Sequence, residues 1–487
     1  MTCVSWDLGS AAVRSRDRQA RLIQWIVGFS TLNNPQKRTV PNSLVISFIG
    51  VLEAFRIVLT SPSYANMVVV ACGWVLTQGP HAITEALVRT GVAGLRHHEA
   101  FHRFFSRGTW KPDRMGLWMF RRLEPFLNDG ILRVVLDDTL APKKGPRVFG
   151  IGNHLDAVRS TKRHKVFCFA HCWVVLAVLV RVPFSERAWA LPVLFRLHRN
   201  LKECTKAEAA YAKKTESARE MLDIFVTWAG KRRVEVAADS AYCNDTVTRG
   251  LSASVVLFGA MRPDAVLTSL PTPRVPGTAG RPSLRGAVVP KPKAIADDPE
   301  IPWESCTAML YGRTRTVRYK TLCAQWYRAC GVGLLRIVIV ATDQGTMPIR
   351  VFFCTDAEVP VVRILETYAS RWGIEVFFRE SKQLLGFADS SARTEAAVLR
   401  VAPFVGLLYT ALVVWFLEGA SQSPLATPPL RPWYKHKRGL CFADILRTAQ
   451  RAMIGFDILD PSKDIKHLQI LARRSVRRRE PERDMAA

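Results

Sequence analysis

At residue 131 the sequence changes from helical periods to runs of strand-forming residues. Before that point apolar residues recur at helical spacing and show no strand alternation. Three strand-like runs then follow in succession, and after them helical and strand-like stretches alternate. The strand-like runs cover 131–136, 165–182, 188–197, 233–239 and 254–261, and the helical stretches cover 206–229 and 244–250. Three consecutive strands followed by this alternation predict a mixed α/β sheet that begins antiparallel.

The rest of the chain divides around this core where the composition changes. Pro interrupts the stretch 263–302 repeatedly, which predicts a long basic loop. Further strand-like runs follow at 315–322, 333–341 and 348–354 before a long helix begins at Val361, so we expect a β-rich insertion within the core. Five segments result: a helical N-terminal DNA-binding region at 1–130, the first part of the core at 131–260, the basic loop and insertion at 261–355, the second part of the core at 356–420, and a linker with a small helix and a basic tail at 421–487.

The chain carries a large excess of positive charge. Its 487 residues include 69 Lys and Arg against 41 Asp and Glu, which gives a net charge of +28. The excess is spread along the sequence except in residues 356–462, where it is only +1. A membrane anchor would concentrate its cations in one short segment, whereas a protein that lies along many phosphates needs them on several elements. We therefore expect a DNA partner and no membrane partner.

Apolar and cysteine patterns are typical of a cytoplasmic protein. The apolar run 401–417 contains Pro403 and Gly406, so we expect a buried core helix there rather than a membrane span. We expect no secretory leader, because no apolar stretch follows the early arginines. The 11 Cys are scattered without a C-x2-C pair, as is usual for reduced thiols in the cytosol.

Two aspartates follow apolar strands of the predicted sheet. Asp137 comes directly after the run 131–136, and Asp239 ends the run 233–239. In open α/β sheets, functional sites form at the edge where such strands end. Either carboxylate could instead cap a turn, so neither residue alone predicts a site.

A third carboxylate, Glu375, lies in a stretch with helical spacing. At 100° per residue, the side chains of Tyr368, Arg371, Glu375 and Lys382 fall within an arc of about 60° on one helix. A hydroxyl, a guanidinium, a carboxylate and an ammonium group would thus share one stripe. The alternative interpretation is a solvated surface stripe held by an i, i+4 ion pair between Arg371 and Glu375.

This stripe resembles the Y-R-E-K signature of one group of bacterial insertion-sequence DDE transposases, with its spacing Tyr368-x2-Arg371-x3-Glu375-x6-Lys382. Residues 136–145 (LDDTLAPKKG) resemble the first acidic block of that family, and residues 238–242 (ADSAY) resemble the second. The likeness covers roughly residues 45–420. It implies an RNase H-like mixed sheet flanked by helices, with a β-rich insertion before the last catalytic helix.

The resemblance implies a catalytic triad of Asp137, Asp239 and Glu375 that binds two divalent ions, Mg²⁺ or Mn²⁺. Two such ions about 4 Å apart can activate a nucleophile and stabilise the leaving oxyanion in phosphodiester cleavage. Carboxylate oxygens are ligands that these ions prefer. Asp138 remains an alternative ligand, because strand alternation sends it and Asp137 to opposite faces and only one of them should bind metal.

The resemblance also implies DNA-binding roles for Tyr368, Arg371 and Lys382, to which we add Lys144 in the first block. Some relatives stack an aromatic side chain on a flipped base, and the resemblance implies Trp303 or Trp326 for this role. Either tryptophan could instead be a core residue. The implied function is a transposase in the bacterial cytoplasm, near the nucleoid, that cleaves its element ends and joins their 3′-hydroxyls to target DNA as a homodimer. Two alternatives stay open: a nuclease of the same fold without strand transfer, and a basic DNA-binding protein without catalysis.

Overall fold

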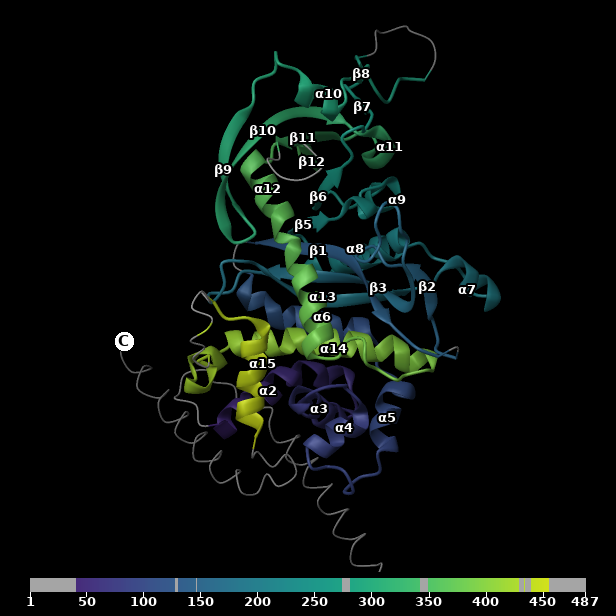
Figure 1. Ribbon diagram of the computed structural model, residues 1–487, viewed down its shortest axis with the longest axis vertical. Coiled ribbons are helices and arrows are strands. Elements are labelled where there is room, and N and C mark those ends of the chain that lie inside the picture. The colour runs from purple at the N-terminus through teal and green to yellow at the C-terminus, as the bar shows by residue number, and fades with distance from the viewer. Residues whose placement is uncertain are drawn as a thin grey trace, which may run out of the picture. The chain divides into compact units, whose positions relative to one another are not determined.

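The computed structural model describes residues 41–127, 130–145, 147–273, 281–341, 349–428, 433 and 439–454 (Figure 1). Its contacts divide the chain into two compact units, which we treat separately. The helical unit comprises Met1–Leu123, Arg147–Phe149 and Glu380–Ala487, and the sheet unit comprises Glu124–Pro146 and Gly150–Arg379.

The sheet unit begins as the sequence predicts. β1 pairs antiparallel with β3 and parallel with β5, and β5 pairs parallel with β6. β2 and β4 each pair antiparallel with β3. The strands are β1 (Ile131–Pro142), β2 (Gly152–Leu155), β3 (Phe167–Val180), β4 (Trp189–His198), β5 (Arg233–Ala238) and β6 (Val255–Met261).

The strands of the predicted insertion continue the same sheet. β12 pairs with β6, β11 with β12, and β10 with both β11 and β9. Across the described residues the sheet has 12 strands. The added elements are β7 (Leu267–Thr268), β8 (Val288–Val289), α10 (Pro292–Asp297), β9 (Glu304–Leu310), β10 (Arg313–Gln325), α11 (Tyr327–Cys330), β11 (Leu334–Ala341) and β12 (Ile349–Cys354).

Helices cover both faces of this sheet. α8 packs against β3, β4 and β5, whereas α12 packs against β5, β6 and β12. Successive side chains of β1 bond to opposite sides, since Asp138 contacts α8 and Asp137 contacts the residue that joins α12 to α13. The helical segments are η3 (Glu124–Phe126), α7 (Leu201–Lys206), α8 (Lys214–Ala229), η4 (Ser240–Tyr242), α9 (Asp245–Thr248), α12 (Val361–Ser370) and α13 (Trp372–Leu384), of which α13 continues into the helical unit.

The helical unit is built around a long apolar helix, α14. α14 packs against α2, α5, α6 and α15. Its segments are α2 (Pro41–Leu52), η2 (Glu53–Val58), α3 (Ser61–Leu76), α4 (Ile83–Arg89), α5 (Glu99–Ser106), α6 (Pro112–Leu123), α14 (Glu395–Leu417), η5 (Ala420–Gln422), η6 (Pro424–Ala426) and α15 (Phe442–Met453). By length and composition α14 could cross a membrane, but 89% of its apolar window is buried inside the structure. This burial is what a core helix requires.

One predicted segment is divided differently in the structure. Residues 356–420 were expected to belong to the core, whereas the structure groups the chain from Glu380 onward with the N-terminal helices. The apolar surface of α14 is buried by those helices, which pack on it from distant parts of the sequence. The predicted basic tail lies outside the described residues.

Candidate active site

The first two acids are neighbours in the sheet. The parallel pairing of β1 and β5 ends with Leu136 opposite Ala238, so Asp137 and Asp239 are the next residues on the two strands. β5 ends there, but β1 continues to Pro142 because β3 pairs with it on its other side, with Asp137 opposite Val175. The sequence predicted Asp137 at the end of a strand, whereas the structure places it inside β1.

Asp239 is not used as a helix cap. It precedes η4 as the N-cap residue, yet its side chain makes no capping hydrogen bond. The alternative role that the sequence left open for this carboxylate is thus not seen. The side chain is partly exposed beside Asp137 and stays available to a ligand.

Arg371 connects the first acid to the third. Its Nη1 donates to Oδ2 of Asp137 at 2.9 Å, and its Nη2 donates to Oε1 of Glu375 at 2.7 Å. The side chains are 14%, 18% and 32% exposed for Arg371, Asp137 and Glu375, so the bridge is largely shielded from solvent. The structure therefore places Asp137 and Glu375 around one guanidinium, with Asp239 at the matching position after the neighbouring strand β5.

The bridging arginine lies where the predicted single helix is divided. α12 ends at Ser370 and α13 begins at Trp372, with Arg371 between them in a helical conformation. Gly373 allows the start of α13 to approach β4, because a Cβ at this position would lie 3.1 Å from the carbonyl oxygen of Ala188. This close approach holds the beginning of α13, and with it Glu375, against the sheet.

Burial makes Asp137 difficult to ionise. It is the largest of the causes that together raise the pKa of this carboxyl to about 7; the nearby Asp138 and Asp239 also raise the pKa, while Arg371 and the Asp138 amide oppose the shift. A carboxylate in such a place needs a cation beside it. Burial similarly raises the pKa of Tyr368 to about 12, so this phenol stays protonated and can donate a hydrogen bond.

Asp138 occupies the opposite face and is fully engaged there. Its Oδ1 accepts from the Tyr242 hydroxyl at 2.7 Å, and its Oδ2 accepts from Lys214 Nζ at 2.7 Å and from Cys172 Sγ at 3.5 Å. Of the two register alternatives, only Asp137 thus lies on the face of Arg371 and Glu375. Strand alternation predicted that the two would separate, but it could not predict which face receives the helix.

The acid site, which comprises Asp137, Asp239 and Glu375, has donor atoms that suit divalent cations. Arg371, however, already occupies the space between Asp137 and Glu375. The donors of the acid site are carboxylates, which divalent ions prefer, and the buried Asp137 needs a positive partner there. Within the described ranges, however, no group of three or more His, Cys, Asp or Glu side chains is arranged to hold a metal ion. The guanidinium that separates Asp137 from Glu375 supplies the balancing charge.

The other predicted residues have varied surroundings. The Tyr368 ring packs on Phe352 at 4.6 Å and lies under the Arg371 guanidinium at 5.6 Å. Lys144 is exposed after β1, and Lys382 is partly exposed on the part of α13 that belongs to the helical unit.

The two tryptophans proposed for base stacking are both packed against other side chains. Trp303 lies beneath Lys320 at 4.9 Å and Arg318 at 5.9 Å. Trp326 contacts the edge of Phe353, with ring centroids 5.4 Å apart. Each side chain is only partly exposed, so part of its surface is already used by protein contacts.

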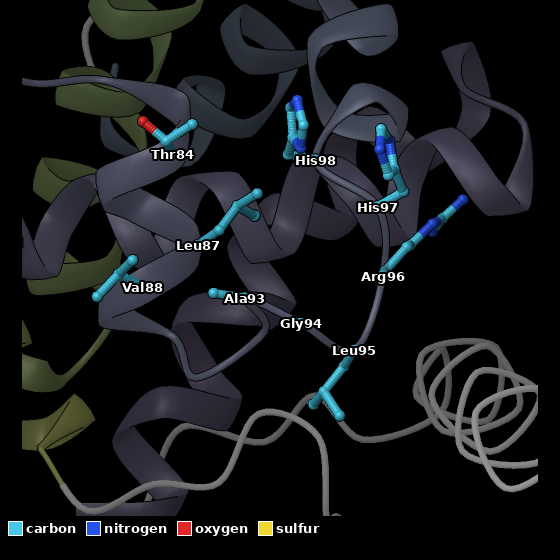
Figure 2. A pocket seen from close by; sticks show the side chains of 9 residues that line it. All are labelled: Thr84, Leu87, Val88, Ala93, Gly94, Leu95, Arg96, His97 and His98. Carbon is cyan, nitrogen blue, oxygen red and sulfur yellow. The ribbon is translucent and has the colours of Figure 1, made fainter. Parts of the chain in front are cut away.

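A pocket of about 420 Å³ in the helical unit has a different character (Figure 2). Leu87, Val88 and Leu95 line it, with His97 and His98 near one end. Its lining contains no carboxylate, so it offers no ligands of the kind found in the acid site.

Residues 65–326 match the family described as DDE superfamily endonuclease, which covers more than half of the chain. The chain belongs to this family. The match includes Asp137 and Asp239 and ends before Glu375. No curated protein matches the chain. Membership indicates a nuclease or transposase of the DDE type, which acts on DNA and belongs to a class of enzymes that generally use divalent metals.

Proposed function

We propose that this DDE-family protein is an insertion-sequence transposase with an RNase H-like core. It binds the ends of its element, cleaves them with two divalent ions and joins the 3′-hydroxyls to target DNA. One observation supports the proposal: Arg371 joins Asp137 to Glu375, and Asp239 follows the neighbouring strand β5 in register with Asp137, although the three acids come from different segments of the chain. Their order and spacing resemble the Y-R-E-K group.

Asp137, Asp239 and Glu375 would hold the ions, either Mg²⁺ or Mn²⁺. When bound, two such ions make a water or 3′-hydroxyl nucleophilic and stabilise the leaving oxyanion. The protein's own part is to present three carboxylates from elements that are fixed by packing. Asp138 does not contribute, because its oxygens are occupied on the other face.

Arg371 has the properties of a phosphate ligand beside this site. In the described part of the chain its Nε is buried without a hydrogen-bond partner, while its two Nη atoms bond to Asp137 and Glu375. A guanidinium can grip a phosphate through two donors at once. If metal ions neutralise the two carboxylates, all the Arg371 donors are free to hold a DNA phosphate. Tyr368, directly beneath it, can donate a further hydrogen bond.

The remaining assignments rest on the resemblance and on charge. Lys144 and Lys382 are proposed to contact the DNA backbone, and Trp303 or Trp326 an unpaired base. Two copies of the chain would bring the two element ends together in the bacterial cytoplasm.

A strand-transfer assay on linear element ends tests the function. With Mg²⁺ or Mn²⁺ we expect products in which the ends are joined to a target plasmid. Cleavage without joining would make the protein a nuclease, and binding without either would remove the catalytic proposal. Glu375→Ala should abolish both reactions and retain end binding. The matched control is Glu220→Ala, which removes an exposed carboxylate on α8 that pairs only with Arg196 in the described interactions.

A further inference from the structure

The face of β1 opposite the acids holds a compact polar cluster, which we call the Asp138 cluster. It consists of Asp138 on β1, Tyr242 in η4, Lys214 at the start of α8 and Cys172 on β3. Four separate elements thus meet at one carboxylate. Tyr242 is 1% exposed and Cys172 is fully buried, whereas Asp138 and Lys214 keep 20% and 37% of their side-chain surface exposed.

All the strong donors of this cluster are directed at the one acceptor. Burial raises the pKa of Tyr242, which keeps its hydroxyl protonated as a donor. Lys214 keeps its charge: burial lowers its pKa, but Cys172 and Asp138 more than offset this effect. Hydrogen bonds to a charged group contribute more than neutral ones. The Asp138 side chain is therefore fixed by two donors that approach it from different elements.

The cluster connects the backbone segments of the first two acids. Tyr242 belongs to the turn that begins at Asp239, since its amide donates to the Asp239 carbonyl at 2.9 Å. Pairing of β1 with β5 ends one residue before the acids, at Leu136 and Ala238. The bond from Tyr242 to Asp138 ties the two strands together just beyond that point.

The backbone amide of Asp138 also orients the first acid, Asp137, directly. The amide of Asp138 donates to Oδ1 of Asp137 at 2.8 Å. The hydrogen bonds to the Asp138 side chain fix this residue from the face opposite the acids. Its backbone amide is therefore held in place, and this amide orients the Asp137 carboxylate. Loss of the hydrogen bonds from Tyr242 and Lys214 to Asp138 would allow the peptide group between Asp137 and Asp138 to rotate, and the Asp137 carboxylate would be misplaced.

We infer that Asp138, Tyr242 and Lys214 are positioning residues that set the spacing of Asp137 and Asp239 from the far side of the sheet. Metal ligands must be placed within about 0.5 Å of their productive geometry, and loss of residues that orient ligands typically weakens metal affinity about 10- to 100-fold. The inference rests on the proposed role of Asp137 and Asp239 as metal ligands. It adds that the second aspartate of the first block acts through the first.

The test is Tyr242→Phe in the full-length chain, with Mn²⁺ binding measured by titration calorimetry without DNA. We expect binding about tenfold weaker than in the wild type. The Mn²⁺ concentration that gives half-maximal cleavage should rise by the same factor, while the affinity for element ends stays unchanged. Unchanged Mn²⁺ affinity in Tyr242→Phe would overturn the inference.

Tyr64→Phe is the matched control. Tyr64 is also 1% exposed, and its hydroxyl donates to a carboxylate, Glu53, at 3.0 Å in the helical unit. It should lose stability without a change in Mn²⁺ affinity. If both variants weaken Mn²⁺ binding equally, the effect is general destabilisation and the inference fails.

Lys214→Met gives a second measurement if Tyr242→Phe folds poorly. Its partly exposed side chain can be replaced with little packing loss, and we expect Mn²⁺ affinity to fall about threefold to tenfold. An unchanged affinity would remove Lys214 from the positioning set. Because Mn²⁺ binding is measured without DNA, a wild type that binds the ion but joins no ends would disprove the transposase function and leave this inference testable.

Discussion

The two faces of β1 hold adjacent aspartates in opposite ways. On one face, Asp137 shares a single guanidinium with Glu375, and burial raises its pKa to about 7. On the other face, Asp138 has its own hydroxyl and ammonium donors. The contrast separates a carboxylate whose partner can be exchanged from one whose partners are fixed. We expect the first to bind ligands and the second to support the first.

The largest effect should separate the two aspartates themselves. Asp137→Asn should lower cleavage by about 10³-fold or more, because a ligand is lost, whereas Asp138→Asn should lower it only about 10- to 100-fold. Both rates are measured on pre-bound ends at a Mn²⁺ concentration well below the wild-type dissociation constant, where the rate follows Mn²⁺ affinity. If Asp138→Asn were the more damaging change, the roles of the two faces would be reversed.

Arg371→Gln should change two measurements in opposite directions. Without DNA, Mn²⁺ affinity should rise, because the competing guanidinium is gone. With DNA, the slope of log affinity against log salt should fall by about one unit, because one phosphate contact is lost. Arg232→Gln is the control, because it removes a different, partly buried ion pair of the sheet unit, the one between Arg232 and Glu124. A salt slope equal to that of the wild type would leave Arg371 without a phosphate role.

Mn²⁺ should stabilise the protein through the acid face alone. A ligand that binds only the folded state at 100 times its dissociation constant adds about 2.7 kcal/mol to the free energy of unfolding. We expect the melting temperature to rise by a few degrees in the wild type and not at all in a double variant, Asp137→Asn with Glu375→Gln. Calorimetric melting with and without Mn²⁺ shows the difference. An equal rise in both proteins would place the ion elsewhere.

The smallest effect should be a loss of stability at low pH that comes from His154, which lies near Asp138. Burial lowers the pKa of His154 to about 4, with His198 and Lys214 lowering it further and Asp138 opposing them. Folding thus favours the neutral ring, so its contribution is complete above pH 6.5 and is lost as the pH falls toward 4. Melting temperatures across this range should fall less steeply in His154→Gln. An unchanged slope in His154→Gln would contradict the assignment.

The sheet was predictable where periodicity is strong. The apolar runs that became β1, β3, β5 and β6 identified the mixed core with its antiparallel start. β9 was missed because most of its side chains, such as Glu304, Ser305 and Thr307, are exposed and polar, so no apolar alternation marks it. The start of its partner β10 was missed for the same reason, because its first four residues are exposed.

The sequence predicted residues for the candidate site but not the contacts among them. Spacing placed Arg371 and Glu375 one helical turn apart, and they do form an ion pair. The bond from Arg371 to Asp137 joins residues 234 positions apart, and local pattern contains no signal for it. Tyr242 could be noticed only as part of the second block, and nothing in the sequence marked Lys214. The grouping of α14 with the N-terminal helices likewise depends on which distant surfaces bury it.

Because Arg371 already bonds to Asp137 and Glu375, metal loading under the proposed function would exchange one cation for another rather than fill a vacant site. The rate and equilibrium of that exchange depend on what the guanidinium can bind after it leaves. In free solution it gains only water, whereas beside a DNA end it gains a phosphate. Under the proposed function, arrival of the DNA would lower the cost of loading the ions, so the protein would be a poor nuclease before it reaches its element ends.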